Sequence, residues 1–135
     1  MREIKFRAKP IEMEDWVYGF GVMTVEYVDG SFSYHLYSNG GDYVVDPETV
    51  GQYPEIKDKN GVEIFEGDIV IREIFARGAY NEDFIGEVKM YEGRWWIDNG
   101  NDAVPLWTEI EELSILGNIY QNPELLNSQS YKSQA

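Results

Sequence analysis

Apolar and polar residues alternate with a period of two along much of the chain, which is typical of β-strands that bury one face. In residues 1–9, Ile4, Phe6 and Ala8 fall on one side and the charged residues fall on the other. We therefore expect a half-buried strand over 1–9, with Lys5, Arg7 and Lys9 on its outer face. The same pattern predicts further strands within 15–28, 31–37, 43–45, 55–56, 62–65, 69–75, 84–90, 94–98 and 114–120.

Turn sequences separate the predicted strands in the first part of the chain. Asp29-Gly30 lies between two alternating runs, which is a strong hairpin signal because both central residues must reach positive φ. Asn39-Gly40-Gly41 predicts a second turn. In Asp46-Pro47-Glu48-Thr49 a capping residue precedes a proline, so we expect a capped turn or a single helical turn there.

Two further turns are predicted in the middle of the chain. The pair Asn60-Gly61 favours a hairpin that joins 55–56 to 62–65. The same place resembles the start of a calcium loop, but Val62 stands where another oxygen ligand is needed, so the hairpin is the better interpretation. In Glu66-Gly67-Asp68 we expect a tight turn whose central glycine takes a conformation that other residues disfavour.

The alternation is interrupted in several places. Arg72 and Glu73 are adjacent charged residues inside a predicted strand, and we interpret them as a β-bulge or a change of strand partner. Thr108 and Glu111 have capping-box spacing, which predicts a short helical turn over 108–113. A last helical turn is predicted over 122–127, while 77–83 is expected to be a loop.

Many short strands with glycine turns indicate a mainly-β protein, a small barrel or sandwich of short antiparallel strands with a few short helical turns. The length of 135 residues suits one domain, or two at most. We expect an acidic N-terminal β region over 1–53 that packs with the rest, a small β-barrel region over 54–127, and a flexible polar tail over 128–135.

The composition excludes several classes of protein. Cys is absent, so the chain has no disulfide framework, no thiolate zinc site and no Cys nucleophile. Aromatic residues make up 15% of the chain, too many for a disordered protein. Neither an apolar run of about 20 residues nor a signal-peptide pattern is present, which predicts a cytoplasmic protein without membrane contact.

The net charge is −14, and it is unevenly distributed. Residues 10–56 contain nine acidic residues and neither Lys nor Arg. Such a segment repels a phosphate backbone, so we expect no direct binding of nucleic acid. The acidic charge is explained either by solubility alone or by a surface that attracts basic proteins.

Few residues offer catalytic or metal chemistry. His35 is the only His; it shares a predicted solvent-facing strand surface with Ser33 and Tyr37, and the sequence assembles no Ser-His-acid arrangement around it. The stretch 98–102 contains Asp and Asn oxygens that suit calcium, but the same residues are typical of a solvated turn. We therefore predict no catalytic residue, no metal and no cofactor.

Adjacent tryptophans suggest an interface. If Trp95 and Ile97 point into the core, Trp96 shares the opposite face with Arg94 and Asp98. Because tryptophan is enriched at interfaces, Trp96 with Arg94 is one candidate interface, unless another segment covers the ring. The second candidate is the positive strand face of Lys5, Arg7 and Lys9, which is complementary to the acidic segment of another copy.

The stretch 51–70, which includes Asp58-Lys59-Asn60-Gly61 and Glu66-Gly67-Asp68, resembles the central motif of the YopX family of phage and prophage proteins. The segments 2–8, 16–19, 46–51 and 115–126 fit the same family in the expected order. The resemblance implies a phage protein of the bacterial host cytoplasm whose C-terminal part is similar to a Src-homology-3-like barrel. The family brings no assigned catalytic residues.

Three functional hypotheses follow, in decreasing order of support. The first is a non-enzymatic protein-interaction or self-assembly module whose partner is itself, as a homo-oligomer, or a host or phage protein. The second is an acidic nucleic-acid mimic that binds a basic host protein. The third is a small hydrolase that uses paired carboxylates.

Overall fold

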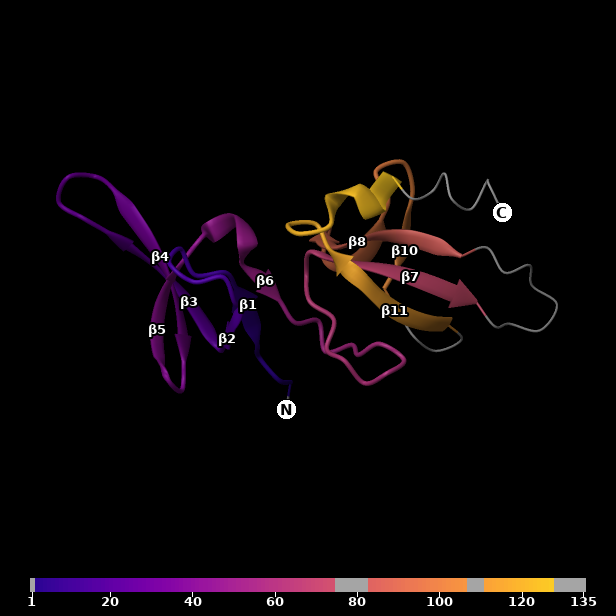
Figure 1. Ribbon diagram of the computed structural model, residues 1–135, viewed down its shortest axis with the longest axis horizontal. Coiled ribbons are helices and arrows are strands. Elements are labelled where there is room, and N and C mark those ends of the chain that lie inside the picture. Colours follow the sequence, from indigo (N-terminus) through magenta and orange to yellow (C-terminus); the bar gives the residue numbers. More distant parts are fainter. Residues whose placement is uncertain (1, 75–82, 107–110, 128–135) are drawn as a thin grey trace. The chain divides into compact units, whose positions relative to one another are not determined.

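The computed structural model describes residues 2–74, 83–106 and 111–127 (Figure 1). The predicted loop over 77–82 and the predicted tail lie outside these residues. The chain divides into two compact units, Met1–Tyr53 and Pro54–Ala135. All strand pairs are antiparallel and the described helices are short 3-10 turns, which confirms the mainly-β fold class. Within the described ranges, no helix has the length and apolar character needed to cross a membrane.

The N-terminal unit contains two three-stranded sheets with the strand orders β2-β1-β6 and β3-β4-β5. The strands are β1 (Phe6–Ala8), β2 (Val17–Gly19), β3 (Gly21–Glu26), β4 (Phe32–Ser38), β5 (Gly41–Val45) and β6 (Gly51–Gln52). β3 pairs with β4 over its full length, whereas β5 pairs only with residues 34–38 of β4. The β3–β4 hairpin therefore continues beyond β5 as a two-stranded ribbon (Figure 1).

The core of this unit is small. Ala8, Leu36 and Val45 are fully buried, and a ring of half-buried apolar residues packs against them: Phe6, Val17, Tyr34, Tyr43 and Val50. The strand predicted over 1–9 is shorter than expected. Only residues 6–8, which form β1, pair with neighbouring strands, because the partner strands β2 and β6 are just three and two residues long.

The predicted turns of the N-terminal unit form where expected, although at Asp29-Gly30 only the glycine takes the positive φ that was expected of both residues. At the β3–β4 hairpin, Gly30 has a φ of 88° and the amide of Tyr27 donates to the carbonyl of Ser31. The hydroxyl and the amide of Ser31 both donate to Asp29 Oδ1, which holds the pKa of Asp29 below its ordinary value. Asp46 caps the 3-10 turn η1 (Pro47–Thr49) by accepting a hydrogen bond from the amide of Glu48.

The C-terminal unit contains one five-stranded sheet with the order β10-β9-β8-β7-β11. Its elements are β7 (Asp68–Ile74), β8 (Phe84–Tyr91), β9 (Arg94–Asp98), β10 (Ala103–Pro105), β11 (Glu111–Asn118) and the 3-10 turn η2 (Pro123–Asn127). Among the described residues β10 and β11 remain the two edges of this sheet, so it is open. The Src-homology-3-like barrel implied by the family resemblance therefore stays a prediction.

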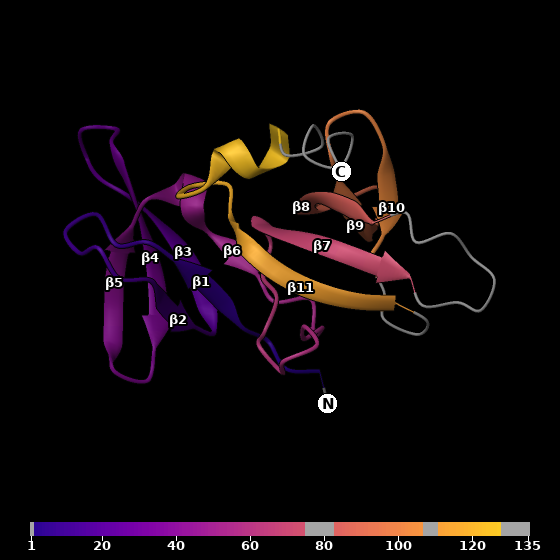
Figure 2. The ribbon, with the colours of Figure 1, turned by 45° about the vertical axis from the view of Figure 1, so that its right-hand side comes forward.

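Both faces of the five-stranded sheet are covered, in the manner of a sandwich. Six buried residues form the larger cluster on one face: Ile64, Val70, Val88, Ile97, Leu106 and Leu113. On the other face, Ile69, Ile71 and Ile85 pack against Ile119 and against Leu125 and Leu126 of η2 (Figure 2). This double burial explains the continuous apolar run 69–71, because consecutive strand residues point to opposite faces.

Two sequence predictions for the C-terminal unit, a bulge and a helical turn, are wrong in detail. The bulge expected at Arg72-Glu73 lies instead in the partner strand β11, between Ile115 and Gly117. Arg72 itself pairs in regular register with Leu113 and Phe84, and its guanidinium lies 5.7 Å from the centre of the Phe84 ring. Residues 111–113 are strand rather than helical turn, since pairing with β7 overrides the capping-box signal; 107–110 lie outside the described residues.

The hairpin predicted around Asn60-Gly61 has the expected turn but lacks the flanking strands. The Asp58 carboxylate accepts hydrogen bonds from the amides of Asn60 and Val62 and holds the turn. The two strands predicted over 55–56 and 62–65 do not form; one isolated bridge, between Lys57 and Glu63, joins the segments before and after the turn. The alternation also failed to predict β10, whose three residues are too short for a recognisable period.

Candidate functional site on the N-terminal unit

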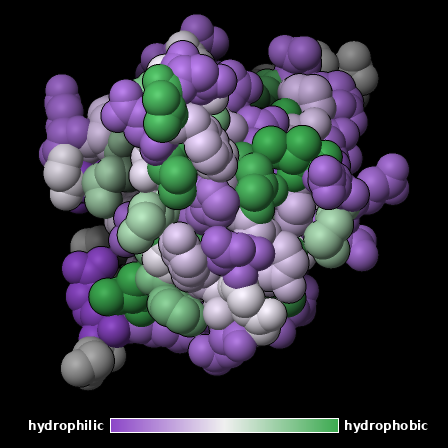
Figure 3. Space-filling view, turned by 90° about the vertical axis from the view of Figure 1, so that its left-hand side faces the viewer, coloured by the Kyte–Doolittle hydropathy of each residue, from purple (hydrophilic) through white to green (hydrophobic). Residues whose placement is uncertain are grey.

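The N-terminal unit has an unusually apolar surface. Among its described residues 2–53, eleven large hydrophobic side chains are more than a third exposed: Ile4, Ile11, Met13, Tyr18, Phe20, Val22, Met23, Tyr27, Val28, Phe32 and Val44. In the described part of the larger C-terminal unit the same class holds Val62, Met90, Tyr91 and Leu116. Figure 3 shows hydrophobic side chains gathered between hydrophilic ones on the side that this unit presents. Exposed apolar patches of this kind mark interaction sites.

The N-terminal unit also exposes many acidic residues. Of the nine acidic residues in the basic-free segment 10–56, all exposed, this unit holds eight and the C-terminal unit holds Glu55; the eight are Glu12, Glu14, Asp15, Glu26, Asp29, Asp42, Asp46 and Glu48. The charge is therefore presented to solvent rather than used in the interior. A surface that combines exposed apolar groups with one sign of charge suits a partner that is apolar and basic.

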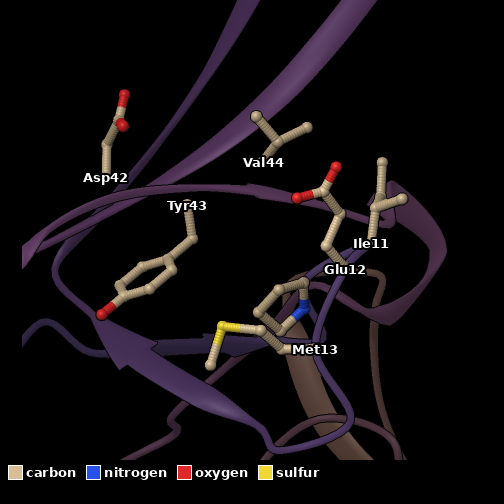
Figure 4. Close-up of a pocket in the computed structure, with 7 residues that line it drawn as sticks. Ile11, Glu12, Met13, Asp42, Tyr43 and Val44 are labelled. Atoms are coloured by element: carbon tan, nitrogen blue, oxygen red, sulfur yellow. The ribbon is translucent and has the colours of Figure 1, made fainter.

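A shallow groove of about 420 Å³ lies on this unit between the segment after β1 and strand β5 (Figure 4). Pro10, Ile11, Glu12 and Met13 form one side, and Asp42, Tyr43 and Val44 form the other. The two sides are tied by the amide of Ile11, which donates to the carbonyl of Val44 at 3.1 Å. The lining is mainly apolar, with the carboxylates of Glu12 and Asp42 beside it.

A line of hydrogen-bonded side chains crosses the β3-β4-β5 sheet. The hydroxyl of Ser33 lies 2.7 Å from His35 Nε2, and His35 Nδ1 lies 3.2 Å from Asp42 Oδ2. The Tyr27 hydroxyl, 2.8 Å from Ser33 Oγ, extends the line. The prediction that no Ser-His-acid arrangement surrounds His35 is therefore wrong, and the His35 side chain is mostly buried, with 14% exposed.

The reason for this error is the strand register. Ser33 and His35 share a face because they are two residues apart on one strand, which the sequence already indicates. Asp42 reaches His35 only because β5 pairs with β4, so that His35 lies opposite Val44 and Asp42 lies opposite Tyr37. An ester-cleaving serine also needs preorganised donors for the oxyanion. Ser33 lies within the β3–β4 ladder, opposite Val25. In such a ladder the backbone amides donate to the neighbouring strand rather than to an oxyanion.

One member of the predicted positive strand face, Arg7, is not on the surface, and the interface role of Lys5 and Lys9 stays a prediction. Arg7 is buried, with 6% of its surface exposed, and its guanidinium stacks 4.6 Å from the centre of the Trp16 ring. Lys5 pairs with Glu3 at 3.1 Å and lies 5.7 Å from the Tyr53 ring centre. Lys9 is half-buried, and its amide donates to Thr49 Oγ1. The exposure predicted for Arg7 is thus wrong, because a cation can be buried when it stacks on an aromatic ring.

Trp96 has the predicted orientation but is covered by its neighbours. Ile97 is fully buried and Trp95 packs on the main core, which leaves Trp96 on the opposite face. The Trp96 ring stacks on Tyr91 at 5.4 Å, and the Arg94 guanidinium lies 5.1 Å from its centre. Its indole N–H donates to the Tyr91 carbonyl. These contacts explain a half-buried tryptophan without a partner protein, and its interface role stays a prediction.

The residues predicted to form structural turns do so. Gly61 and Gly67 have φ values of 83° and 92°, which favour glycine. The buried carboxylate of Asp68 accepts a hydrogen bond from the amide of Phe65, and the Asp68 amide donates to the Phe65 carbonyl. Asn60 contributes its amide to the Asp58 turn. These residues therefore shape the backbone and are remote from the apolar surface in sequence.

The oxygen-rich stretch 98–102 forms a turn. Asp98 Oδ1 accepts from the amide of Gly100, and Asn99 Oδ1 accepts from the amides of Asn101 and Asp102. Backbone amides thus bind one side-chain oxygen each of Asp98 and Asn99, as in a turn. In the described ranges, no group of three or more His, Cys, Asp or Glu side chains is arranged to hold a metal ion.

The fold and this surface define a mainly-β protein with two compact units and an apolar, acidic N-terminal face. The YopX protein family matches residues 5–127, and the chain belongs to that family. The chain resembles the crystal structure of YopX from Bacillus subtilis, with a TM-score of 0.54 and 21% identity over 90% of this chain and 96% of that one. It also resembles the crystal structure of protein EF1440 from Enterococcus faecalis, with a TM-score of 0.51 and 23% identity over 92% and 98%. No curated protein matches the sequence.

Proposed function

We propose that this protein is a non-enzymatic protein-interaction and self-assembly module whose N-terminal unit carries the docking surface. The supporting observation is the concentration of exposed large apolar side chains on that unit. Burying apolar surface on association contributes roughly 25 cal/mol per Å². A soluble domain exposes so many such groups at a cost in solubility, which is offset when a partner covers them.

The test is site-specific crosslinking in a bacterial host. We replace Phe32, on the apolar surface, by the photoreactive p-benzoylphenylalanine, and use Tyr91 of the C-terminal unit as the matched position, since both rings are exposed. The proposal expects a crosslinked polypeptide, either a second copy or another protein, from position 32 and little from position 91. Equal crosslinking at both positions, or none at position 32, contradicts it.

The acidic nucleic-acid mimic is a second candidate, favoured by the nine exposed acidic residues of segment 10–56. In this function a basic, DNA-binding host protein occupies the acidic surface. The expected crosslinking partner is then such a protein, and added DNA competes with the complex. Because charge pairs of this kind are screened by salt, the complex weakens as ionic strength rises.

A non-enzymatic role is part of the proposal even though Ser33, His35 and Asp42 are aligned. An activated serine reacts with a fluorophosphonate probe, so that probe decides the matter. We expect no labelling of Ser33 above the level of Ser33→Ala. Labelling that disappears in His35→Gln and Asp42→Asn, with an unchanged circular dichroism spectrum, contradicts this part of the proposal.

The proposal places the protein among phage or prophage proteins that act in the bacterial host cytoplasm. Its support is the family membership together with the phage origin that the sequence resemblance implies. Fractionation of a lysogenic host with an antibody against the chain tests it. Recovery in the periplasmic or membrane fraction contradicts this location.

A further inference from the structure

The edges of the sheets differ in how they are protected from pairing with another chain. Natural proteins block exposed edge strands with charges, proline, bulges, short length or a covering segment. In the five-stranded sheet, edge strand β10 has three residues and ends in Pro105. The other edge, β11, carries Glu112 and a register shift, and its Leu113 carbonyl accepts the amide of Lys59.

The β3-β4-β5 sheet is protected on one edge. The segment after β1 lies along β5, because the amide of Ile11 donates to the Val44 carbonyl and the amide of Asp46 donates to the Lys9 carbonyl. Pro10 bridges Val45 between these two bonds. A proline inside the covering segment ends further pairing there, since it has no amide hydrogen.

The opposite edge, β3, has none of these devices along residues 21–25. It runs for six residues, Gly21–Glu26, without lysine, proline or a register shift, and it pairs with β4 alone among the described strands. Met23 is 54% exposed on one face of the strand, and Val22 and Thr24 are exposed on the other face. Its sequence has a high β-propensity and a single charge at one end, which is typical of a strand that adds to another sheet.

We propose that β3 pairs antiparallel with β3 of a second copy and joins the two β3-β4-β5 sheets into one six-stranded sheet. This assigns one edge to the self-assembly of the proposed function and therefore rests on it. A two-fold axis perpendicular to the sheet relates the two copies of β3 and keeps the same face of each sheet on the same side. Such an axis places one central residue of β3, either Met23 or Thr24, opposite its own copy. Glu26 of one copy then lies opposite Phe20 of the other if the axis passes Met23, or opposite Val22 if it passes Thr24. Parallel in-register pairing would instead place the two Glu26 carboxylates side by side, which is unfavourable.

The absence of cysteine makes the register directly testable. Met23→Cys and Thr24→Cys each introduce a unique thiol at a candidate axis, where the two copies place equivalent Cβ atoms within disulfide reach. Val44→Cys, exposed to a similar degree on β5, is the matched control. Mild oxidation is expected to give a disulfide-linked dimer from one of the first two variants, and far less from the control.

Sedimentation equilibrium provides the second readout. The wild-type chain is expected to be dimeric, and Met23→Lys is expected to raise the dimer dissociation constant by about tenfold or more. Val44→Lys adds the same charge on β5 and should leave the constant unchanged. Because both copies are acidic, added salt should tighten the dimer by screening their repulsion.

Several results would overturn the inference. They are a monomeric wild type, a dimer that Met23→Lys leaves intact, or disulfide formation from Val44→Cys equal to that from positions 23 and 24. If the wild type is monomeric while position 32 captures another protein in the host, the β3 pairing is wrong and the proposed function stands. If the wild type is monomeric and position 32 captures no protein, the β3 pairing and the proposed function are both wrong.

Discussion

The two units of this protein use their apolar residues in opposite ways. The C-terminal unit buries them on both faces of one sheet, in two clusters of six and three buried residues. The N-terminal unit has three buried residues in its core and a larger set of exposed apolar side chains. Because burial is the main stabilising term in folding, the C-terminal unit is built for stability.

This contrast is the reason why the proposed function assigns the docking surface to the N-terminal unit. A unit of 53 residues has a small interior. Each apolar residue that lies on its surface therefore leaves fewer apolar residues to form its core. The N-terminal unit compensates with stacked and hydrogen-bonded pairs, such as Arg7 on Trp16 and His35 with Asp42. In the proposed function, its exposed apolar residues contact another chain.

The largest effect is expected from truncating the two cores. Ile97→Ala removes a fully buried side chain from the larger cluster and should lower the free energy of unfolding by about 3–5 kcal/mol. Leu36→Ala in the N-terminal core should cost about 2–3 kcal/mol, because the half-buried residues around it can relax into the space. Denaturant titration measures both values. Equal or reversed losses would show that the N-terminal core is as tightly packed as the C-terminal one.

A smaller loss of stability is expected from replacing a glycine at which two backbone segments lie in close contact; each unit has such a glycine. A Cβ atom on Gly86 would lie 2.8 Å from the carbonyl of Asp98, and one on Gly19 would overlap the Tyr37 carbonyl. Gly86→Ala and Gly19→Ala should each lower stability by about 1–3 kcal/mol. Gly21→Ala is the control, since open space surrounds that position. If all three variants melt at the same temperature, these close approaches relax freely.

Gly67 tests backbone strain in the C-terminal unit. Its φ of 92° disfavours other residues, and an added Cβ would lie 3.0 Å from the Tyr120 ring. Gly67→Val should cost about 1–2 kcal/mol, measured as a lowered melting temperature. Gly61→Val is the comparison, because Gly61 has a similar φ of 83° but open space around it. A smaller loss at Gly67 than at Gly61 would contradict a contribution from the ring.

The smallest effect concerns the titration of Glu87 on β8. Burial raises its pKa, an effect partly opposed by Lys89 and reinforced by Asp98 and Glu66. The folded chain therefore retains a proton that the unfolded chain has released, so this stability contribution is full in acid and is lost as pH rises through the folded-state pKa. Glu87→Gln, which stays neutral, should match the wild type in acid and be slightly more stable near neutral pH. A wild type that is more stable than the variant at neutral pH would reverse the sign of this prediction.

Local sequence determined much of the secondary structure. Asp29-Gly30, Asn60-Gly61 and Gly67 form their turns where expected, because positive φ is a local property of glycine. Alternation predicted the opposite orientations of Trp95 and Trp96, because neighbouring strand residues always point to opposite faces. The match of residues 5–127 to the YopX family likewise follows from sequence alone.

Tertiary structure decided what the candidate surface consists of. Alternation places Arg7 on an outer face, but Trp16 from another part of the chain covers it. Asp42 meets His35 through the β4–β5 register, which residues on either strand do not encode by themselves. Whether an edge is covered also depends on a distant segment, as at β5, where residues 9–11 lie along the strand. Backbone preferences act over a few neighbouring residues, whereas register, stacking and edge protection depend on which segments meet in space.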